Sequence, residues 1–162
     1  MSFNPRFGHV NLIARDWRRV AAFFTNVFGC TLVPPERDYK SAELDAGTAL
    51  RDAHLTGCHL RLPGFGDDGP TIEIFCYAEV EAKGPVAVNR LGFGHICFQV
   101  DSVSEAQAAV LAAGGQAVGD IVTLRTSDGR FVTWCYVTDV ESNVIELQSW
   151  SAPDAAASDA TT

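Results

Sequence analysis

The sequence has no cluster of lysine or arginine residues. Lysine and arginine together number 12, against 20 aspartate and glutamate residues, and the formal net charge is −8 at pH 7. A protein that binds nucleic acid or an anionic membrane surface needs positive charge to meet the phosphate groups. The composition therefore argues against both kinds of partner.

The chain also lacks a long apolar run and a basic-then-apolar leader. A transmembrane helix needs roughly 18 or more consecutive apolar residues, and no stretch approaches that length. A secretory signal segment would begin with basic residues followed by an apolar core. We therefore expect a cytoplasmic protein that makes no contact with a membrane.

The cysteines show no pairing pattern. There are five, an odd number, and no Cys-x-x-Cys motif occurs. They are widely spaced along the chain: Cys30, Cys58, Cys76, Cys97 and Cys135. We predict buried free thiols in a reducing compartment, rather than disulfides or a thiolate zinc site.

Apolar residues are abundant enough to build a core. They make up 47% of the 162 residues, which suits one compact domain. We expect this domain over residues 1–150, with a first module at 7–78, a linker at 79–91 and a second module at 92–150. Residues 151–162 are mostly Ala, Ser, Asp and Thr and are expected to form a flexible tail.

A duplicated pattern organises the chain. The tripeptide Phe-Gly-His occurs twice, ending at His9 and at His95, 86 positions apart (95 − 9). Each copy opens an apolar stretch typical of a buried strand. Each half also closes on a strand in which one carboxylate lies between large apolar residues, Glu73 in the first half and Glu146 in the second. A repeat of this length indicates a duplicated module rather than a solenoid.

Each half is predicted to run strand, helix and three strands. The predicted strands are 7–14, 30–33, 53–63 and 71–77 in the first half, and 93–100, 117–123, 131–138 and 144–150 in the second. The apolar positions of 17–28 and 103–113 recur at helical spacing. Two such halves give an α+β fold with curved mixed sheets, helices outside and a cleft between them.

The helix ends carry typical capping residues. Asp16 is expected to cap the first helix, and either Asp101 or Ser102 the second, because their side chains can accept the free N–H groups of a first turn. Gly29 is expected to end the first helix in a left-handed conformation. Residues 34–52 are polar and irregular, and we predict a long loop of the kind that often has a binding role.

Four residues carry the candidate chemistry. A buried ionised carboxylate costs several kcal/mol unless it is paired or bound to a metal. Glu73 and Glu146 are matched by His9 and His95, one pair in each half. Two imidazoles and two carboxylates suit a divalent first-row metal. Four such ligands leave two positions of an octahedral ion for water or substrate, as a catalytic site requires.

With these motifs the chain resembles the vicinal oxygen chelate superfamily, which contains glyoxalase I, methylmalonyl-CoA epimerase, extradiol dioxygenases and bleomycin-resistance proteins. The resembling segments are Gly8-His9-Val10, residues 16–29, Gly94-His95-Ile96 and Asn143-Val144-Ile145-Glu146-Leu147. The resemblance implies two tandem βαβββ modules around a metal-binding cleft. It places His9, Glu73, His95 and Glu146 at the four ligand positions of glyoxalase I.

The resemblance also implies a reaction class. Members with all four ligands belong to the metal-dependent lyase, isomerase and epimerase branch, which removes a proton next to a metal-bound carbonyl. The implied cofactor is one nickel, cobalt, zinc or manganese ion. The implied substrate is a hemithioacetal, an acyl thioester or another carbonyl compound. A homodimer is expected, with the site formed within one chain or across two.

Roles for individual residues follow from the same resemblance. Glu146 is expected to be the general base, and Glu73 can serve the opposite face of the substrate. His59 lies on the strand where methylmalonyl-CoA epimerase carries an additional catalytic glutamate. His54 is a weaker candidate for a chemical role. Arginines that could meet the carboxylates of glutathione lie outside any transferable motif: Arg15, Arg37, Arg51, Arg61, Arg125 and Arg130.

Two other hypotheses stay open. One is an extradiol-type dioxygenase that holds Fe(II) with His9, His95 and Glu146. The other is a small-molecule binding protein of the bleomycin-resistance type, without catalysis. One scaffold in this superfamily hosts several chemistries, so the choice depends on the site itself.

Overall fold

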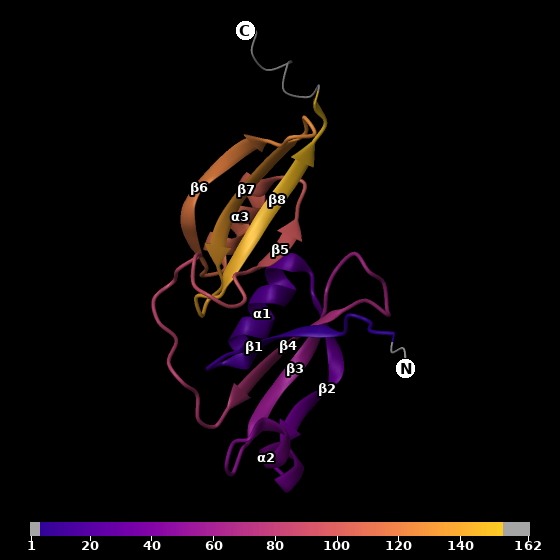
Figure 1. Ribbon diagram of the computed structural model, residues 1–162, viewed down its shortest axis with the longest axis vertical. Helices are drawn as coiled ribbons and strands as arrows, with labels where there is room; N and C mark the ends of the chain where they lie inside the picture. The colour runs from indigo at the N-terminus through magenta and orange to yellow at the C-terminus, as the bar shows by residue number, and fades with distance from the viewer. Residues whose placement is uncertain (1–3, 154–162) are drawn as a thin grey trace. The chain divides into compact units, whose positions relative to one another are not determined.

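The computed structural model describes residues 4–153, and the chain divides into two compact units, Met1–Gly84 (unit 1) and Pro85–Thr162 (unit 2). Each unit contains a four-stranded mixed sheet with a helix of ten or more residues packed on it (Figure 1). The strand order has the same form in both units. The predicted α+β fold of two βαβββ-like modules is therefore confirmed.

Unit 1 follows the predicted order with one added helix. Its elements are β1 (His9–Ile13), α1 (Trp17–Phe28), β2 (Thr31–Tyr39), α2 (Ala42–Thr48), β3 (Leu55–Arg61) and β4 (Thr71–Tyr77). The sheet order is β1-β4-β3-β2, with β1 parallel to β4 and the other pairs antiparallel. The first and last strands of the unit are therefore neighbours, although they are far apart in the sequence.

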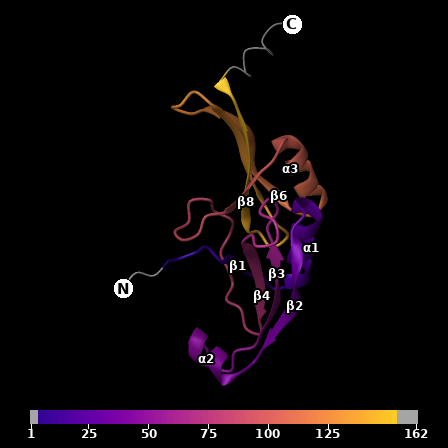
Figure 2. The same ribbon diagram turned by 90° about the vertical axis from the view of Figure 1, so that its right-hand side faces the viewer.

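Helix α1 covers one face of this sheet. The Asp16 side chain accepts a hydrogen bond from the Arg19 N–H, and Gly29 ends the helix with φ 69°, as predicted for both caps. The buried side of the helix consists of Trp17, Val20, Ala21, Phe23 and Phe24. It packs on β3 and β4 (Figure 2). The side chains of these two strands that lie on the covered face are fully buried: Cys58, Leu60, Ile72 and Ile74.

Residues 34–52 do not form the predicted loop. Strand β2 continues through Pro34 and Pro35 to Tyr39, with a shift of register between Val33 and Arg37, and α2 follows. The prediction was wrong because prolines and charged residues are typical of a loop, whereas here they belong to an edge strand of the sheet. An edge strand tolerates proline, since only one of its sides pairs with another strand.

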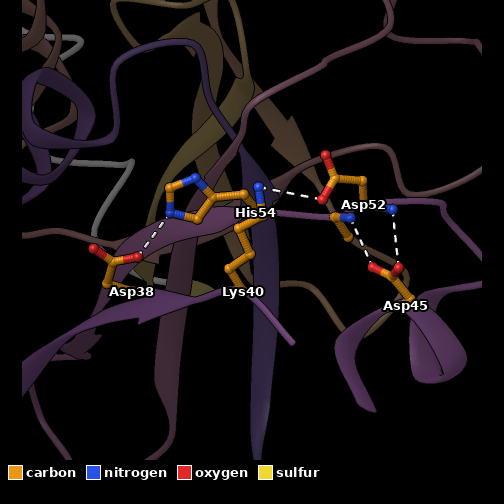
Figure 3. Close-up of polar contacts among 6 residues, drawn as sticks. Asp38, Lys40, Asp45, Asp52 and His54 are labelled. Carbon is orange, nitrogen blue, oxygen red and sulfur yellow. Dashed lines mark hydrogen bonds and ion pairs between the residues drawn. The ribbon is translucent and has the colours of Figure 1, made fainter. Parts of the chain in front are cut away.

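Helix α2 is tied to the start of β3 by polar contacts (Figure 3). The Asp45 carboxylate accepts hydrogen bonds from the N–H of Asp52, at 2.9 Å, and from the N–H of the next residue, at 2.7 Å. Lys40 Nζ lies 3.2 Å from Asp52 Oδ1, and His54 Nε2 lies 2.8 Å from Asp38 Oδ1. These contacts hold in place the segment that was predicted to be an irregular loop.

Unit 2 repeats the topology, and its described residues, 85–153, form one α-helix. Its elements are β5 (Ile96–Gln99), α3 (Val103–Ala112), β6 (Gln116–Arg125), β7 (Phe131–Thr138) and β8 (Val144–Ser151), in the sheet order β5-β8-β7-β6. Ser102 is the N-cap of α3. Strand β5 begins three residues later than predicted, because Gly92 has φ 112° and the fully exposed Phe93 lies outside the sheet. Leu111, one of the apolar positions of α3, is 45% exposed.

No disulfide links the five cysteines, and they differ in burial. Cys30, Cys58 and Cys135 are buried, whereas Cys76 is half-buried and Cys97 is exposed. Burial raises the pKa of the Cys30 and Cys58 thiols to about 11, so these thiols stay protonated and unreactive. The prediction failed for Cys97 because it lies on the face of β5 opposite to buried Phe98.

Two further expectations concern the ends of the chain and the membrane. Residues 154–162 of the tail predicted to be flexible lie outside the described part of the chain. Among residues 4–153, the helices are too short or too polar to span a bilayer.

Gly57 of β3 is required by the close approach of its neighbours. A Cβ atom at this position would lie 2.2 Å from the Ile74 carbonyl oxygen and 2.5 Å from Cδ1 of Phe75, its register partner on β4. The Phe75 ring also meets the His59 ring edge-on, at 6.0 Å between centroids. Gly57 thus makes room for the ring that packs against His59.

We expect Gly57→Ala to lower the free energy of unfolding by about 1–3 kcal/mol, because the added carbon overpacks a site closed by backbone. Gly47→Ala in α2 is the matched control, since a Cβ there meets nothing within 4 Å. It should raise stability by about 0.4–1 kcal/mol through a less flexible unfolded chain. Urea denaturation measures both, and a Gly57→Ala variant as stable as wild type would contradict this packing.

Candidate functional site

The candidate residues of unit 1 lie on the sheet face opposite α1. Asn11 of β1 and His59 of β3 are both register partners of Glu73 on β4. Directly opposed residues on neighbouring strands point to the same face. His9 precedes Asn11 by two positions and therefore shares that face. The strand pairing thus gathers two histidines and an amide around one carboxylate.

Glu73 is held at both of its carboxylate oxygens. Its Oε1 lies 2.9 Å from His59 Nε2, and its Oε2 lies 3.2 Å from His9 Nε2. Asn11 Nδ2 donates to Oε2 as well, at 3.2 Å. The side chains of Glu73 and His59 are only 14% and 18% exposed, so these bonds satisfy groups largely removed from water.

His59 is held in one tautomer by its two partners. Burial lowers its pKa; the Glu73 carboxylate opposes that shift, and Arg37 and His9 add to it. The ring is therefore neutral at neutral pH. Its Nδ1 lies 3.3 Å from Thr71 Oγ1, so the threonine hydroxyl donates to Nδ1 while Nε2–H donates to Glu73. Thr71, His59 and Glu73 form one directed chain of hydrogen bonds.

The candidate residues of unit 2 form a simpler pair. His95 Nε2 lies 2.8 Å from Glu146 Oε2, with side-chain exposures of 33% and 19%. The His95 ring lies 5.1 Å from the ring of Tyr136, the register partner of Glu146 on β7. Burial, and after it the charges of Glu146 and Cys97, raise the pKa of Tyr136, so its phenol stays protonated.

The two units place different residues at equivalent positions. Register partners of the carboxylate are Asn11 and His59 in unit 1 and Cys97 and Tyr136 in unit 2. In the described part of the chain, His95 is the one side chain that forms an ion pair with Glu146. One carboxylate is thus fixed by three donors and the other by one.

Each predicted histidine–glutamate pair is in contact within its own unit, His9 with Glu73 and His95 with Glu146. The separations are hydrogen-bond distances, so each histidine contacts its glutamate directly. Within residues 4–153 no group of three or more histidine, cysteine, aspartate or glutamate side chains is placed to hold a metal ion. His54 lies elsewhere, paired with Asp38.

Sequence reasoning missed Asn11, Thr71 and Tyr136. Asn11 and Thr71 each stand two positions from a predicted ligand in a strand, and that spacing was the available signal. Tyr136 could not be matched to Glu146 without the β7–β8 register. Among the arginines considered for anion binding, Arg37 lies near enough to His59 to affect its pKa, whereas Arg130 is paired with Asp128.

The sequence of the chain matches a model of the family that these histidine–glutamate pairs suggest. The model of the Glyoxalase/Bleomycin resistance protein/Dioxygenase superfamily matches residues 6–147, most of the chain. No curated protein shows significant sequence similarity to this chain.

Several solved structures share the fold. A glyoxalase family protein from Bacillus cereus has 19% sequence identity and a TM-score of 0.75, with 94% of this chain and 99% of that chain covered. The fosfomycin resistance protein FosX from Listeria monocytogenes has 17% identity and a TM-score of 0.59, with coverage of 92% and 96%. A variant of FosX, complexed with Mn(II) and a dihydroxypropylphosphonic acid, has 18% identity and a TM-score of 0.54, with 90% of each chain covered.

We expect the pKa of His59 in the metal-free protein to lie below the ordinary value of about 6.5. Glu73→Gln should lower it further, because it removes the negative charge that favours the imidazolium ion. NMR titration of the ring protons measures both values. A His59 pKa that rises in Glu73→Gln would contradict the described contact.

Proposed function

Because the chain belongs to the Glyoxalase/Bleomycin resistance protein/Dioxygenase superfamily, we propose that it is a metal-dependent enzyme that removes a proton next to a carbonyl group. The reaction class is that of glyoxalase I-like lyases and isomerases, or of epimerases. The observation that carries the proposal is the duplicated pair, His9 with Glu73 and His95 with Glu146, each in contact on the sheet face away from the main helix.

The donor set fits a divalent first-row metal. Imidazole nitrogens and carboxylate oxygens are the mixed ligands that such ions accept. Both carboxylates are largely buried, at 14% and 19% exposure, and a buried carboxylate needs a cation or strong donors as partners. We assign His9, Glu73, His95 and Glu146 as the ligands of nickel, cobalt, zinc or manganese. A bound metal supplies Lewis acidity that stabilises the charge developing on a carbonyl oxygen.

We assign the general base to Glu146. In the described residues it has one ion-pair partner, so one carboxylate oxygen can accept a proton without breaking several bonds. It takes the proton from the carbon next to the carbonyl and returns it at the end of the turnover. Glu73 is less free to do this, because three donors hold it.

His59 is a positioning residue in this proposal. Its Nε2–H holds Oε1 of Glu73 at 2.9 Å, and Thr71 fixes the opposite side of the ring. This arrangement orients the carboxylate that binds the metal, in the way that outer hydrogen bonds commonly orient metal ligands.

Hemithioacetals and acyl thioesters are the carbonyl substrates to be assayed first.

Glu146→Ala should lose most of the bound metal, because it removes a ligand and leaves His95 without its partner. Plasma mass spectrometry after reconstitution should find about one divalent ion per wild-type chain, as expected for a catalytic site. His54→Ala is the control, since His54 contacts Asp38 and neither pair. Equal metal in wild type and Glu146→Ala would contradict the assignment, and iron in the native protein would favour the dioxygenase hypothesis.

Glu146→Gln should slow exchange of the substrate's proton with solvent deuterium by about 10²–10⁴-fold, while an amide oxygen can still bind the metal. Glu73→Gln should instead weaken metal binding, and added metal should restore its exchange rate. Proton NMR in deuterium oxide follows the exchange for each substrate. If Glu146→Gln exchanges as fast as wild type with metal bound, Glu146 is not the base.

A further inference from the structure

We propose that Trp134 and Tyr136 form a subsite for a planar aromatic part of the substrate, beside His95 and Glu146. The inference rests on the proposed function, because it places the reacting carbonyl at Glu146. It adds a substrate class that the reaction type does not specify.

The two rings lie next to the histidine–glutamate pair. Tyr136 is the register partner of Glu146, and Trp134, two positions earlier on β7, is the partner of Gln148. The His95 and Tyr136 rings are 5.1 Å apart, and the Tyr136 and Trp134 rings 5.0 Å apart. The aromatic surface is therefore continuous with the ion pair and extends away from it along β7.

The core of unit 2 does not use these rings. Cys135 and Val137, which alternate with them on β7, are fully buried on the face that α3 covers. Trp134 and Tyr136 lie on the other face and are only partly buried. Partly exposed aromatic surface of this kind, next to a polar pair, is typical of a ligand site.

Unit 1 shows that the fold itself does not require the rings. The residues equivalent to Tyr136 and Trp134 are His59 and Gly57, the register partners of Glu73 and Phe75. There the Phe75 ring lies over Gly57 and closes that part of the face. In unit 2, Gln148 is the residue equivalent to Phe75, and its register partner is Trp134 instead of a glycine. The same fold thus has this surface covered by the Phe75 ring in unit 1 and lined by two aromatic rings in unit 2.

The geometry and charge of this surface define the ligand. The Trp134 and Tyr136 ring planes meet at 71°, so a planar group can stack on one ring and meet the edge of the other. Gln148 offers a neutral amide opposite Trp134. Arg130 stacks on Trp150 and pairs with Asp128, so its charge is already matched. A neutral aromatic group therefore suits this surface better than a phosphonate or a nucleotide.

Two 2-oxo acids that differ in one ring test the subsite. Benzoylformate and pyruvate are titrated by calorimetry into metal-free and manganese-loaded protein. We expect wild type to bind benzoylformate about tenfold more tightly than pyruvate, as stacking and burial of one ring imply. Trp134→Leu should reduce this preference to about twofold or less, and Trp134→Phe should keep most of it.

The matched control is Phe65→Leu, which removes an aromatic ring of unit 1 that is 64% exposed. It should leave the preference for benzoylformate unchanged. Thermal melts of each variant establish that the fold is kept. Equal affinities in wild type would overturn the subsite, as would a preference that Trp134→Leu leaves intact.

The two proposals fail in different ways in this experiment. If metal strengthens binding of both acids equally but benzoylformate gains nothing over pyruvate, the subsite is wrong and the metal site stands. If the preference depends on Trp134 but neither acid responds to metal, the subsite stands and the metal-dependent chemistry is wrong.

Discussion

A carboxylate in the middle of a sheet face is the constraint on which both units depend. Glu73 and Glu146 are 14% and 19% exposed, and such a group is costly unless strong donors or a cation meet it. Each unit meets the constraint with a histidine at the start of its first strand, since His9 begins β1 and His95 immediately precedes β5. That contact is possible because the first strand pairs in parallel with the last, while the long helix covers the opposite face.

The two units satisfy the same constraint with different neighbours. Around Glu73 the cross-strand positions carry Asn11 and His59, which bind its carboxylate directly. Around Glu146 they carry Cys97 and Tyr136, and the surface continues into aromatic rings. Under the proposed function this asymmetry separates two tasks, with a firmly held carboxylate in unit 1 and a more mobile base beside a substrate surface in unit 2.

Local signals in the sequence predicted the parts of the fold that depend on neighbours along the chain. The cap at Asp16 and the left-handed Gly29 depend on one helix alone, and the structure has both as predicted. Of the apolar positions at helical spacing in α1, Val20, Phe23 and Phe24 are buried. Residues 34–52 were missed because β2 is recognised by its pairing with β3 and not by its own composition. Cys97 was misplaced because strand residues alternate between faces, and only the pairing shows which face is covered.

The sequence by itself determined the duplication and the two histidine–glutamate pairs, because a repeated motif and an isolated carboxylate in an apolar strand can be recognised without knowing what surrounds them. Only the tertiary structure decided what surrounds each pair. His59 reaches Glu73 through the register of β3 with β4, and Tyr136 lies opposite Glu146, with Trp134 beside it, through the register of β7 with β8. Strand register is a contact between distant segments, and a shift of one residue would turn each of these side chains to the opposite face.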